Sequence, residues 1–177
     1  RGHLVRAAIQ LLRSLGIELE GDQELQQVEL SQKGLDADAI RLLSALVRPD
    51  SSLLSLKLGY NALRDEGASV IARGLETHRN ILVIDLGFNS IGDKGVEAIA
   101  KGLAATRTLQ TLYLSGNSIQ PAGFKALASA LARNRSLTAL HLTGNAGGAQ
   151  GAEALAQALE RNTTLQTLYV SGNNIGP

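Results

Sequence analysis

An eleven-residue segment recurs six times along this chain at a constant spacing of 28 residues, and no other feature limits the possible folds as strongly. The copies begin at Leu25, Leu53, Ile81, Leu109, Leu137 and Leu165. The stretches between them repeat as well, as GASVIARGL (67–75), GVEAIAKGL (95–103), GFKALASAL (123–131) and GAEALAQAL (151–159). Such a period predicts an array of equivalent supersecondary units.

The two halves of each unit differ in their apolar pattern. The Leu-x-Leu pair in each eleven-residue segment alternates with period two, as in a strand with one buried face. In the other half, apolar residues such as Val70, Ile71 and Leu75 follow helical spacing. One strand and one helix cannot bury their apolar faces alone, whereas stacked copies can. The sequence therefore predicts an α/β solenoid, with a parallel β-sheet on the concave face and helices on the convex face.

The shared pattern, LxxLxLxxNxI, resembles the leucine-rich repeat. The long helical half and the 28-residue period are similar to those of the ribonuclease-inhibitor-like subfamily, which includes the C-terminal repeats of NOD-like immune receptors and Ran GTPase-activating proteins. The resemblance covers about residues 25–177 and implies a horseshoe-shaped solenoid. We expect residues 1–24 to form an N-terminal capping helix and lead-in. Residues 25–177 would form the repeat domain, with six strand segments and an incomplete last repeat.

An asparagine follows the strand in every copy except the first, which has Lys33 at this position. The chain turns into the core there, and buried turns leave backbone groups in need of partners. An amide side chain can both donate and accept hydrogen bonds. We therefore predict a structural asparagine ladder. Its members are Asn61, Asn89, Asn117, Asn145 and Asn173.

The stretch LHLTGNAGGAQGAEALA (140–156) has the strand, glycine-rich turn and helix order of a phosphate-binding loop. The repeat accounts for this order, because Gly144 and Gly151 have glycine counterparts in other copies. Gly147 is different, since the other copies have Leu or Ile there. Either neighbouring side chains fill the missing volume, or this loop is locally mobile.

The residue between the two strand leucines points away from the core. Along the repeats this column holds Glu29, Lys57, Asp85, Tyr113, His141 and Tyr169. Aromatic side chains on such a face can anchor a partner, or they can simply stabilise adjacent strands. The predicted partner-binding residues are Lys57, Tyr60, Asp85, Phe88, Tyr113, His141 and Tyr169. A second candidate is a rim of Arg79, Arg107 and Arg135, which could meet an acidic partner or could merely be solvated.

The sequence offers few residues in patterns that indicate a catalytic, metal or cofactor site. The chain has no cysteine, and its three histidines occupy unrelated columns, so we expect no metal site, no cofactor and no catalytic residues. The acidic residues Asp65, Glu66 and Asp93 are better interpreted as helix N-terminal capping and dipole partners. A net charge of +1 argues against nucleic acid or an anionic membrane as partner. The absence of cysteine favours an intracellular, cytoplasmic location.

The two ends depart from the repeat. Residues 3–15 predict an amphipathic helix that covers the first repeat, although an arginine-containing segment at 1–17 is also compatible with a mitochondrial presequence. Ending at Pro177 leaves Leu168, Val170 and Ile175 on an open edge. We therefore expect either a longer native chain or self-association through that edge.

These features favour a non-enzymatic protein–protein interaction scaffold that binds a protein partner on its concave face. One alternative is a GTPase-activating regulator of a small GTPase, with Arg64 as the exposed loop arginine that the resemblance requires. A single-turnover GTP hydrolysis assay distinguishes these two hypotheses. Another alternative is the ligand-sensing repeat domain of an intracellular immune receptor.

Overall fold

The structure is a computed structural model that describes residues 2–17, 25–49 and 51–177. Within these residues six short strands form one parallel sheet in chain order. They are β1 (Gln27–Glu29), β2 (Ser55–Lys57), β3 (Val83–Asp85), β4 (Thr111–Tyr113), β5 (Ala139–His141) and β6 (Thr167–Tyr169). Each strand residue lies opposite the residue 28 positions later, as Leu56 pairs with Ile84. The sequence repeat therefore becomes a set of straight columns across the sheet.

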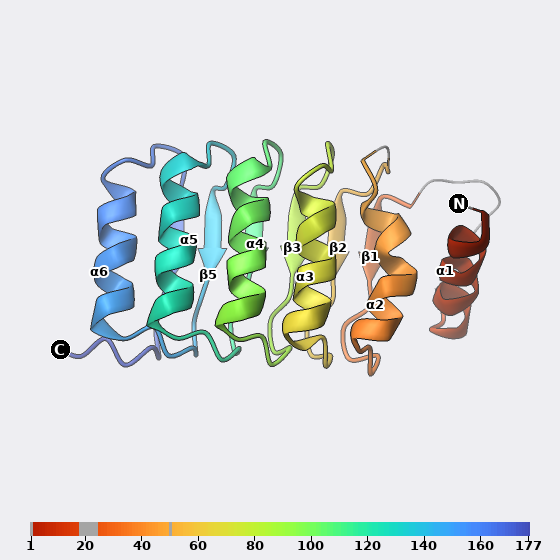
Figure 1. Ribbon diagram of the computed structural model, residues 1–177, viewed down its shortest axis with the longest axis horizontal. Coiled ribbons are helices and arrows are strands. Elements are labelled where there is room, and N and C mark those ends of the chain that lie inside the picture. Colours follow the sequence, from red (N-terminus) through yellow and green to blue (C-terminus); the bar gives the residue numbers. More distant parts are fainter. Residues whose placement is uncertain (1, 18–24, 50) are drawn as a thin grey trace.

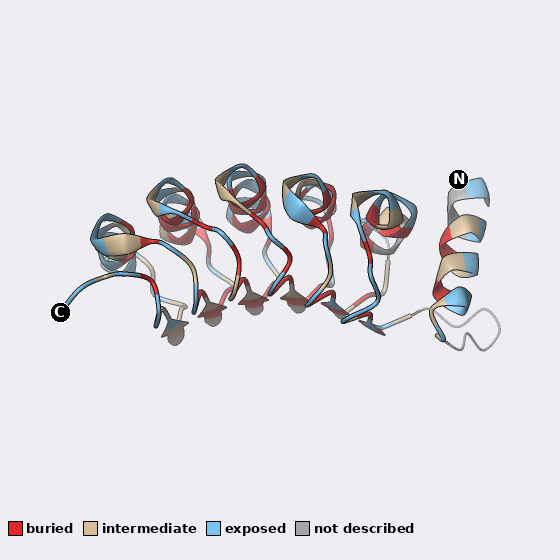
Figure 2. Ribbon diagram, turned by 90° about the horizontal axis from the view of Figure 1, so that it is seen from below, coloured by how far each residue is buried: buried red, intermediate tan, exposed pale blue. Residues whose placement is uncertain are grey.

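Helices alternate with the strands and cover one face of the sheet. The helical elements are α1 (Gly2–Ser14), α2 (Ala37–Leu43), the 3₁₀ helix η1 (Ser44–Val47), α3 (Arg64–Leu75), α4 (Asp93–Ala105), α5 (Pro121–Arg133) and α6 (Gly148–Leu159). Figure 1 shows α2 to α6 side by side in chain order, with α1 beyond α2. Seen from below, the helices lie on the outer side of an arc and the strands along its inner side (Figure 2). The predicted α/β solenoid is confirmed.

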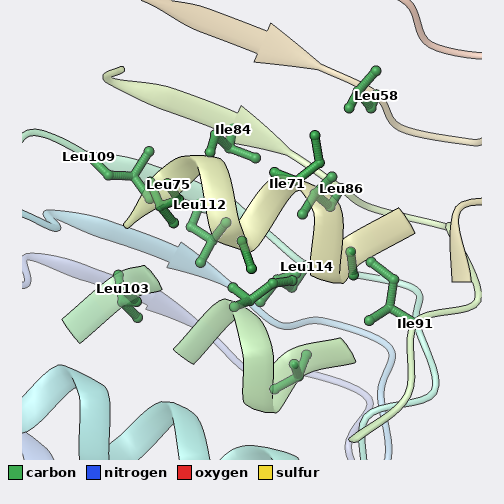
Figure 3. Packing of buried hydrophobic residues seen from close by; sticks show 14 of the residues in the cluster. Leu58, Ile71, Leu75, Ile84, Leu86, Ile91, Leu103, Leu109, Leu112 and Leu114 are labelled. Carbon is green, nitrogen blue, oxygen red and sulfur yellow. The ribbon is translucent and has the colours of Figure 1, made fainter. Parts of the chain in front are cut away.

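The core is one continuous apolar layer between the sheet and the helices. Leu112 in β4 and Leu114 just after it are fully buried, and they face helix residues such as Leu75 and Leu103 (Figure 3). Burying such a side chain stabilises the fold by about 1.5–3 kcal/mol. The central repeats contribute equivalent core positions, so each unit is stabilised chiefly by its neighbours.

The asparagine column bridges consecutive repeats. Asn117 Oδ1 accepts hydrogen bonds from Asn89 N (2.9 Å) and Ile91 N (3.0 Å), both in the preceding repeat. Its Nδ2 donates to Leu86 O (3.1 Å) and Leu114 O (2.9 Å). Side-chain amides of Asn61, Asn89, Asn145 and Asn173 bond in the same way across repeats. Each amide thus satisfies buried backbone groups of two repeats.

A second polar column, which the sequence analysis missed, lies at the turns that lead into the strands. It consists of His78, Thr106, Asn134 and Asn162. Asn134 Oδ1 accepts from Ser136 N (2.9 Å) and Leu137 N (2.7 Å), and its Nδ2 donates to Leu103 O (2.8 Å). The column therefore secures these turns as the other asparagines secure the turns after the strands.

His78 fulfils only part of that role. Its Nδ1 accepts from Asn80 N (3.1 Å) and Ile81 N (3.0 Å), which requires a neutral ring with the proton on Nε2. Nε2 is buried without a hydrogen-bond partner. Burial lowers the pKa of His78 below its ordinary value. The folded state therefore favours the uncharged imidazole.

The space left by the missing aliphatic side chain at Gly147 is filled by Phe124. This ring is fully buried. A Cβ atom at Gly147 would lie 2.2 Å from Phe124 Cε2. Gly147 has an ordinary right-handed conformation, with φ −64°. The glycine is therefore required by the ring and not by the backbone, and of the two alternatives left open by the sequence, the filled gap is the one observed.

The acidic residues near the helix starts cap across repeats. Asp65 Oδ1 accepts from Gly92 N (2.7 Å) and Gly95 N (3.1 Å) at the start of α4. Asp93 Oδ1 accepts from Gln120 N (2.8 Å) and Gly123 N (3.2 Å) at the start of α5. The sequence predicts capping and dipole partners. In the structure Asp65 and Asp93 lie in the first turn of their own helices and each caps the following helix. The residue that follows Asp93 in this column, Pro121, has no side-chain acceptor to offer α6.

The two ends of the described chain differ in how they are covered. At one end α1 lies against α2 and buries Ala8 and Leu12. At the other end Leu168 and Val170 are only partly buried, although their counterparts Leu112 and Leu114 are completely buried. None of the helices in the described chain combines the length and apolarity that spanning a membrane requires.

Candidate functional site

The inner face of the sheet carries the outward-pointing column that the sequence predicted. Neighbouring strands bring Lys57 opposite Asp85 and Asp85 opposite Tyr113. They also bring Tyr113 opposite His141 and His141 opposite Tyr169. The face is charged over β1 to β3 and aromatic over β4 to β6.

The aromatic half of the column is a stacked ladder. The ring centroids of Tyr113 and His141 are 4.2 Å apart with an interplanar angle of 22°. Those of His141 and Tyr169 are 4.7 Å apart at 23°. Burial between these rings lowers the pKa of His141, and the charge of Asp85 partly opposes this effect. The ladder therefore presents a largely uncharged surface at neutral pH.

A second aromatic pair lies in the loops that follow β2 and β3. Tyr60 and Phe88 stack with centroids 4.4 Å apart and nearly parallel planes, at 6°. They are among the most exposed large hydrophobic side chains of the described chain, at 54% and 46%. Both belong to the predicted binding residues. The structure thus groups them as a pair separate from the ladder.

Tyr60 and Phe88 have left-handed backbones, with φ of 58° and 57°. The later repeats place Gly116, Gly144 and Gly172 in the same conformation. A side chain in this region costs about 1–2 kcal/mol relative to glycine. Gly116 also makes room for the pair, because a Cβ atom there would lie 2.3 Å from Phe88 Cε1. The only sequence signal for this conformation was that aromatic residues and glycine share one column.

Asp85 is the half-buried acid at the centre of the face. Its Oδ1 accepts a hydrogen bond from Gly87 N (2.9 Å). Burial raises the pKa of Asp85, the Gly87 hydrogen bond lowers it, Glu29 raises it, and Lys57 and His141 lower it. The salt bridges found among the described residues are those of Arg41 with Asp38 and Glu66. Lys57 and Asp85 are therefore neighbours without direct ion-pair contact.

A hollow of about 570 Å³ lies on this face beside the charged half of the column. It is lined by Ile17, Gln27, Val28, Glu29, Ser55, Lys57, Val83, Thr111 and Tyr113. The lining combines polar, charged and aromatic side chains. Because pockets for small ligands are lined mostly by apolar side chains, this mixed lining does not favour a cofactor.

The other candidates lie elsewhere. Arg79, Arg107 and Arg135 are exposed at the turns that lead into the strands, and Arg135 Nη1 bonds back to Ala132 O and Asn134 O. Arg64 is exposed at the first residue of α3. In the described ranges, no three His, Asp or Glu residues come together as they would to hold a metal ion.

A solenoid of parallel strands and helices, with an accessible aromatic inner face, defines a repeat protein of the leucine-rich class. A family model described as "Leucine Rich repeat" matches residues 50–72, 77–100, 106–128, 133–156 and 161–177. The chain belongs to the leucine-rich repeat family.

The solved structures that are similar to this chain include the following two. One is described as "Leiomodin-1 Actin-Binding Site 2 (ABS2)", with 24% identity, a TM-score of 0.64, and coverage of 74% of this chain and 76% of that chain. The other is the tropomodulin C-terminal domain of Caenorhabditis elegans, with 16% identity, a TM-score of 0.67, and coverage of 75% and 82%. At these identities the likeness extends to the fold alone. No curated protein matches the sequence.

Proposed function

We propose that this chain is a non-enzymatic scaffold that binds a protein partner on its concave face. The observation that carries the proposal is the exposed pair Tyr60 and Phe88, held in a backbone conformation that glycine adopts more cheaply. Backbone strain of this kind persists where the surrounding structure enforces it, and it clusters at functional sites. The binding surface is completed by Lys57, Asp85, Tyr113, His141 and Tyr169.

The alternative is that the aromatic rings only stabilise the neighbouring strands, and it explains the two aromatic groups unequally. Stacking between neighbouring strands can by itself account for Tyr113, His141 and Tyr169. Tyr60 and Phe88 also bond to the next repeat, since their backbone N–H groups donate to Gly87 O and Ser115 O (2.9 Å each). Their position differs from the ladder in being left-handed, so that glycine would cost less there. Exposed aromatic side chains of large area are the usual anchors of protein interfaces. The left-handed backbone belongs to this turn in every repeat, Gln32 included. Recognition of a partner gives a reason for large exposed rings at a position where the later repeats have glycine.

The proposal also includes the repeat subfamily and the cellular location of the protein. The 28-residue period favours the ribonuclease-inhibitor-like subfamily, and the cysteine-free sequence favours a cytoplasmic setting. Because a shared fold does not carry a shared function, the leiomodin and tropomodulin likeness only makes actin a reasonable first test protein.

The test is affinity capture with the intact chain, repeated with a Tyr60→Gly, Phe88→Gly double variant. Glycine relieves the left-handed strain while removing the ring contact, so we expect unfolding free energy to change by less than about 1 kcal/mol. A partner found by capture, with purified actin as a defined comparison, should lose affinity for the variant. A stable variant with unchanged affinity would overturn this site.

The aromatic ladder of Tyr113, His141 and Tyr169 is tested with its own pair of variants. Tyr113→Ala and Tyr169→Ala should each weaken partner binding by about 2 kcal/mol if these residues are hot spots. Unchanged affinity in both pairs of variants would move the site to the rim of Arg79, Arg107 and Arg135. Circular dichroism spectra and unfolding midpoints show whether each variant is correctly folded.

A further inference from the structure

The surroundings of Asp85 differ from those of the other column residues. The position two residues after the column holds Ser31, Ser115, Thr143 and Ser171 in four repeats, but Gly87 in the repeat of Asp85 and Gly59 in the repeat before it. Neither glycine has a positive φ. The backbone therefore gives no reason for glycine at these two positions.

The two glycines border the carboxylate itself. A Cβ atom at Gly87 would lie 3.2 Å from Asp85 Oδ1, and one at Gly59 would lie 3.4 Å from Asp85 Oδ2. A serine at either position would put a hydroxyl donor against the carboxylate. With glycine there, Oδ1 keeps its single bond from Gly87 N, and the described residues supply no donor to Oδ2. The half-buried carboxylate thus lies over two buried glycines with its Oδ2 unbonded by any described residue, at a place that we call the Asp85 recess and define by Gly59, Asp85 and Gly87.

The charges around the recess leave a negative excess. The column holds Glu29 and Asp85 with Lys57 between them, and no ion pair within contact distance neutralises Asp85 in the described chain. His141, two strands away, carries little charge at neutral pH because its burial favours the neutral ring. A half-buried carboxylate is stabilised by a cation that brings its own hydrogen-bond donors.

Tyr113 adds a second element of recognition. It lies opposite Asp85 in the sheet, and one face of its ring is stacked on His141. The other face is directed toward β3 and borders the hollow that Lys57 and Val83 also line. A cation placed over this face gains a cation–π contact while it pairs with the carboxylate, a combination that suits guanidinium best.

Given the proposed function, on which this step rests, we infer that the Asp85 recess receives an arginine or lysine side chain of the bound protein segment, held between the Asp85 carboxylate and the ring of Tyr113. Apolar residues of the same segment then lie on Tyr60 and Phe88, whose loops directly follow Gly59 and Gly87. Lys57 pairs with acidic groups of the segment or turns toward Glu29.

The experiment is a selection of random twelve-residue peptides against the intact chain and against Asp85→Asn. Asparagine keeps an acceptor for Gly87 N and removes the charge. Glu29→Gln is the matched control, because Glu29 is in the same column and bonds Ser31 N in the same way (2.8 Å). Peptides selected by the wild-type chain should share one basic residue at a fixed distance from an apolar residue.

The decisive measurement is a double-mutant cycle with one selected peptide. Changing its shared basic residue to alanine should weaken binding to wild type about tenfold or more, and binding to Asp85→Asn about twofold or less. Binding to Glu29→Gln should behave as with wild type. Selected peptides without a shared basic residue, or equal losses on wild type and Asp85→Asn, would overturn the inference and leave the concave-face function standing. Peptides that bind the Tyr60→Gly, Phe88→Gly variant equally well would instead count against that function.

Discussion

Replacing Gly147 by isoleucine should destabilise the protein, and adding Phe124→Val should restore most of the loss. A Cβ atom at Gly147 would approach three atoms of the Phe124 ring to within 2.2–2.6 Å. Since Cβ is fixed to the backbone, it cannot rotate away, so the buried ring must move. Overpacking of this kind costs about 1–3 kcal/mol.

The reverse change alone removes part of a fully buried ring. A large-to-small substitution of phenylalanine to alanine costs about 3–5 kcal/mol, and valine retains part of the contact, so we expect about 2–3 kcal/mol for Phe124→Val. In the double variant the isoleucine side chain occupies the space of the ring. The preceding repeat already uses this pairing, with Val96 and Ile119 at the equivalent positions and both completely buried.

The assay is urea unfolding followed by far-ultraviolet circular dichroism for the wild type, both single variants and the double variant. We expect the double variant to lie within about 1 kcal/mol of wild type, so the two changes are coupled by about 2 kcal/mol or more. Gly148→Ala is the control. Its φ of +65° makes alanine strained, but the nearest atom to its Cβ is Pro121 Cγ at 3.9 Å, so its effect should add to that of Phe124→Val. Additive effects of Gly147→Ile and Phe124→Val would refute the reasoning.

Three further expectations concern stability. His78 is held neutral with a lowered pKa, so the unfolded chain binds a proton that the folded chain does not, and stability falls as pH drops below about 6.5. His78→Asn should reduce the loss of stability between pH 7.5 and 5.5, measured as the shift of the urea midpoint. His141→Asn should reduce it less, because His141 is less buried. A His78→Asn variant with the same pH dependence as wild type would contradict this expectation. Asp93→Ala should cost about 1 kcal/mol in the same assay by uncapping α5, whereas Asp93→Asn should cost less. In the 177-residue monomer, backbone amides of 165–171 should exchange hydrogen much faster than those of 84–88, and equal protection that disappears on dilution would indicate edge-to-edge dimers.

The parts of the fold that depend on a column of similar residues could be predicted from the sequence. Parallel pairing at a 28-residue offset places residues such as Asp85 and Tyr113 opposite each other, so a shared position in the repeat becomes a shared face. The same offset explains why aromatic residues far apart in sequence stack as a ladder. The column of His78, Thr106, Asn134 and Asn162 was missed because its positions hold three residue types of different size and chemistry, which share the ability to accept a hydrogen bond.

Other features depend on contacts between unlike positions of adjacent repeats. Asp93 caps the helix after its own, and Phe124 fills the space at Gly147 in the following repeat. A comparison within one column cannot show such pairs, because each partner looks like an unexplained exception. The left-handed backbone of Tyr60 and Phe88 was hidden for a similar reason, since only the glycines of their column suggest it.

Some residues differ from the other residues at their position in the repeat. They fall into groups according to whether another residue of the chain compensates for the difference. Gly147 is compensated, because Phe124 supplies the volume that it lacks. His78 is not compensated, since its Nε2 is buried without a partner, but it is inaccessible and cannot contact a partner protein. Tyr60 and Phe88 are strained and exposed, and their rings stack on each other without being buried in the core. They are thus the exceptions for which recognition of another molecule gives the remaining physical reason, and binding should be more sensitive to them than folding is.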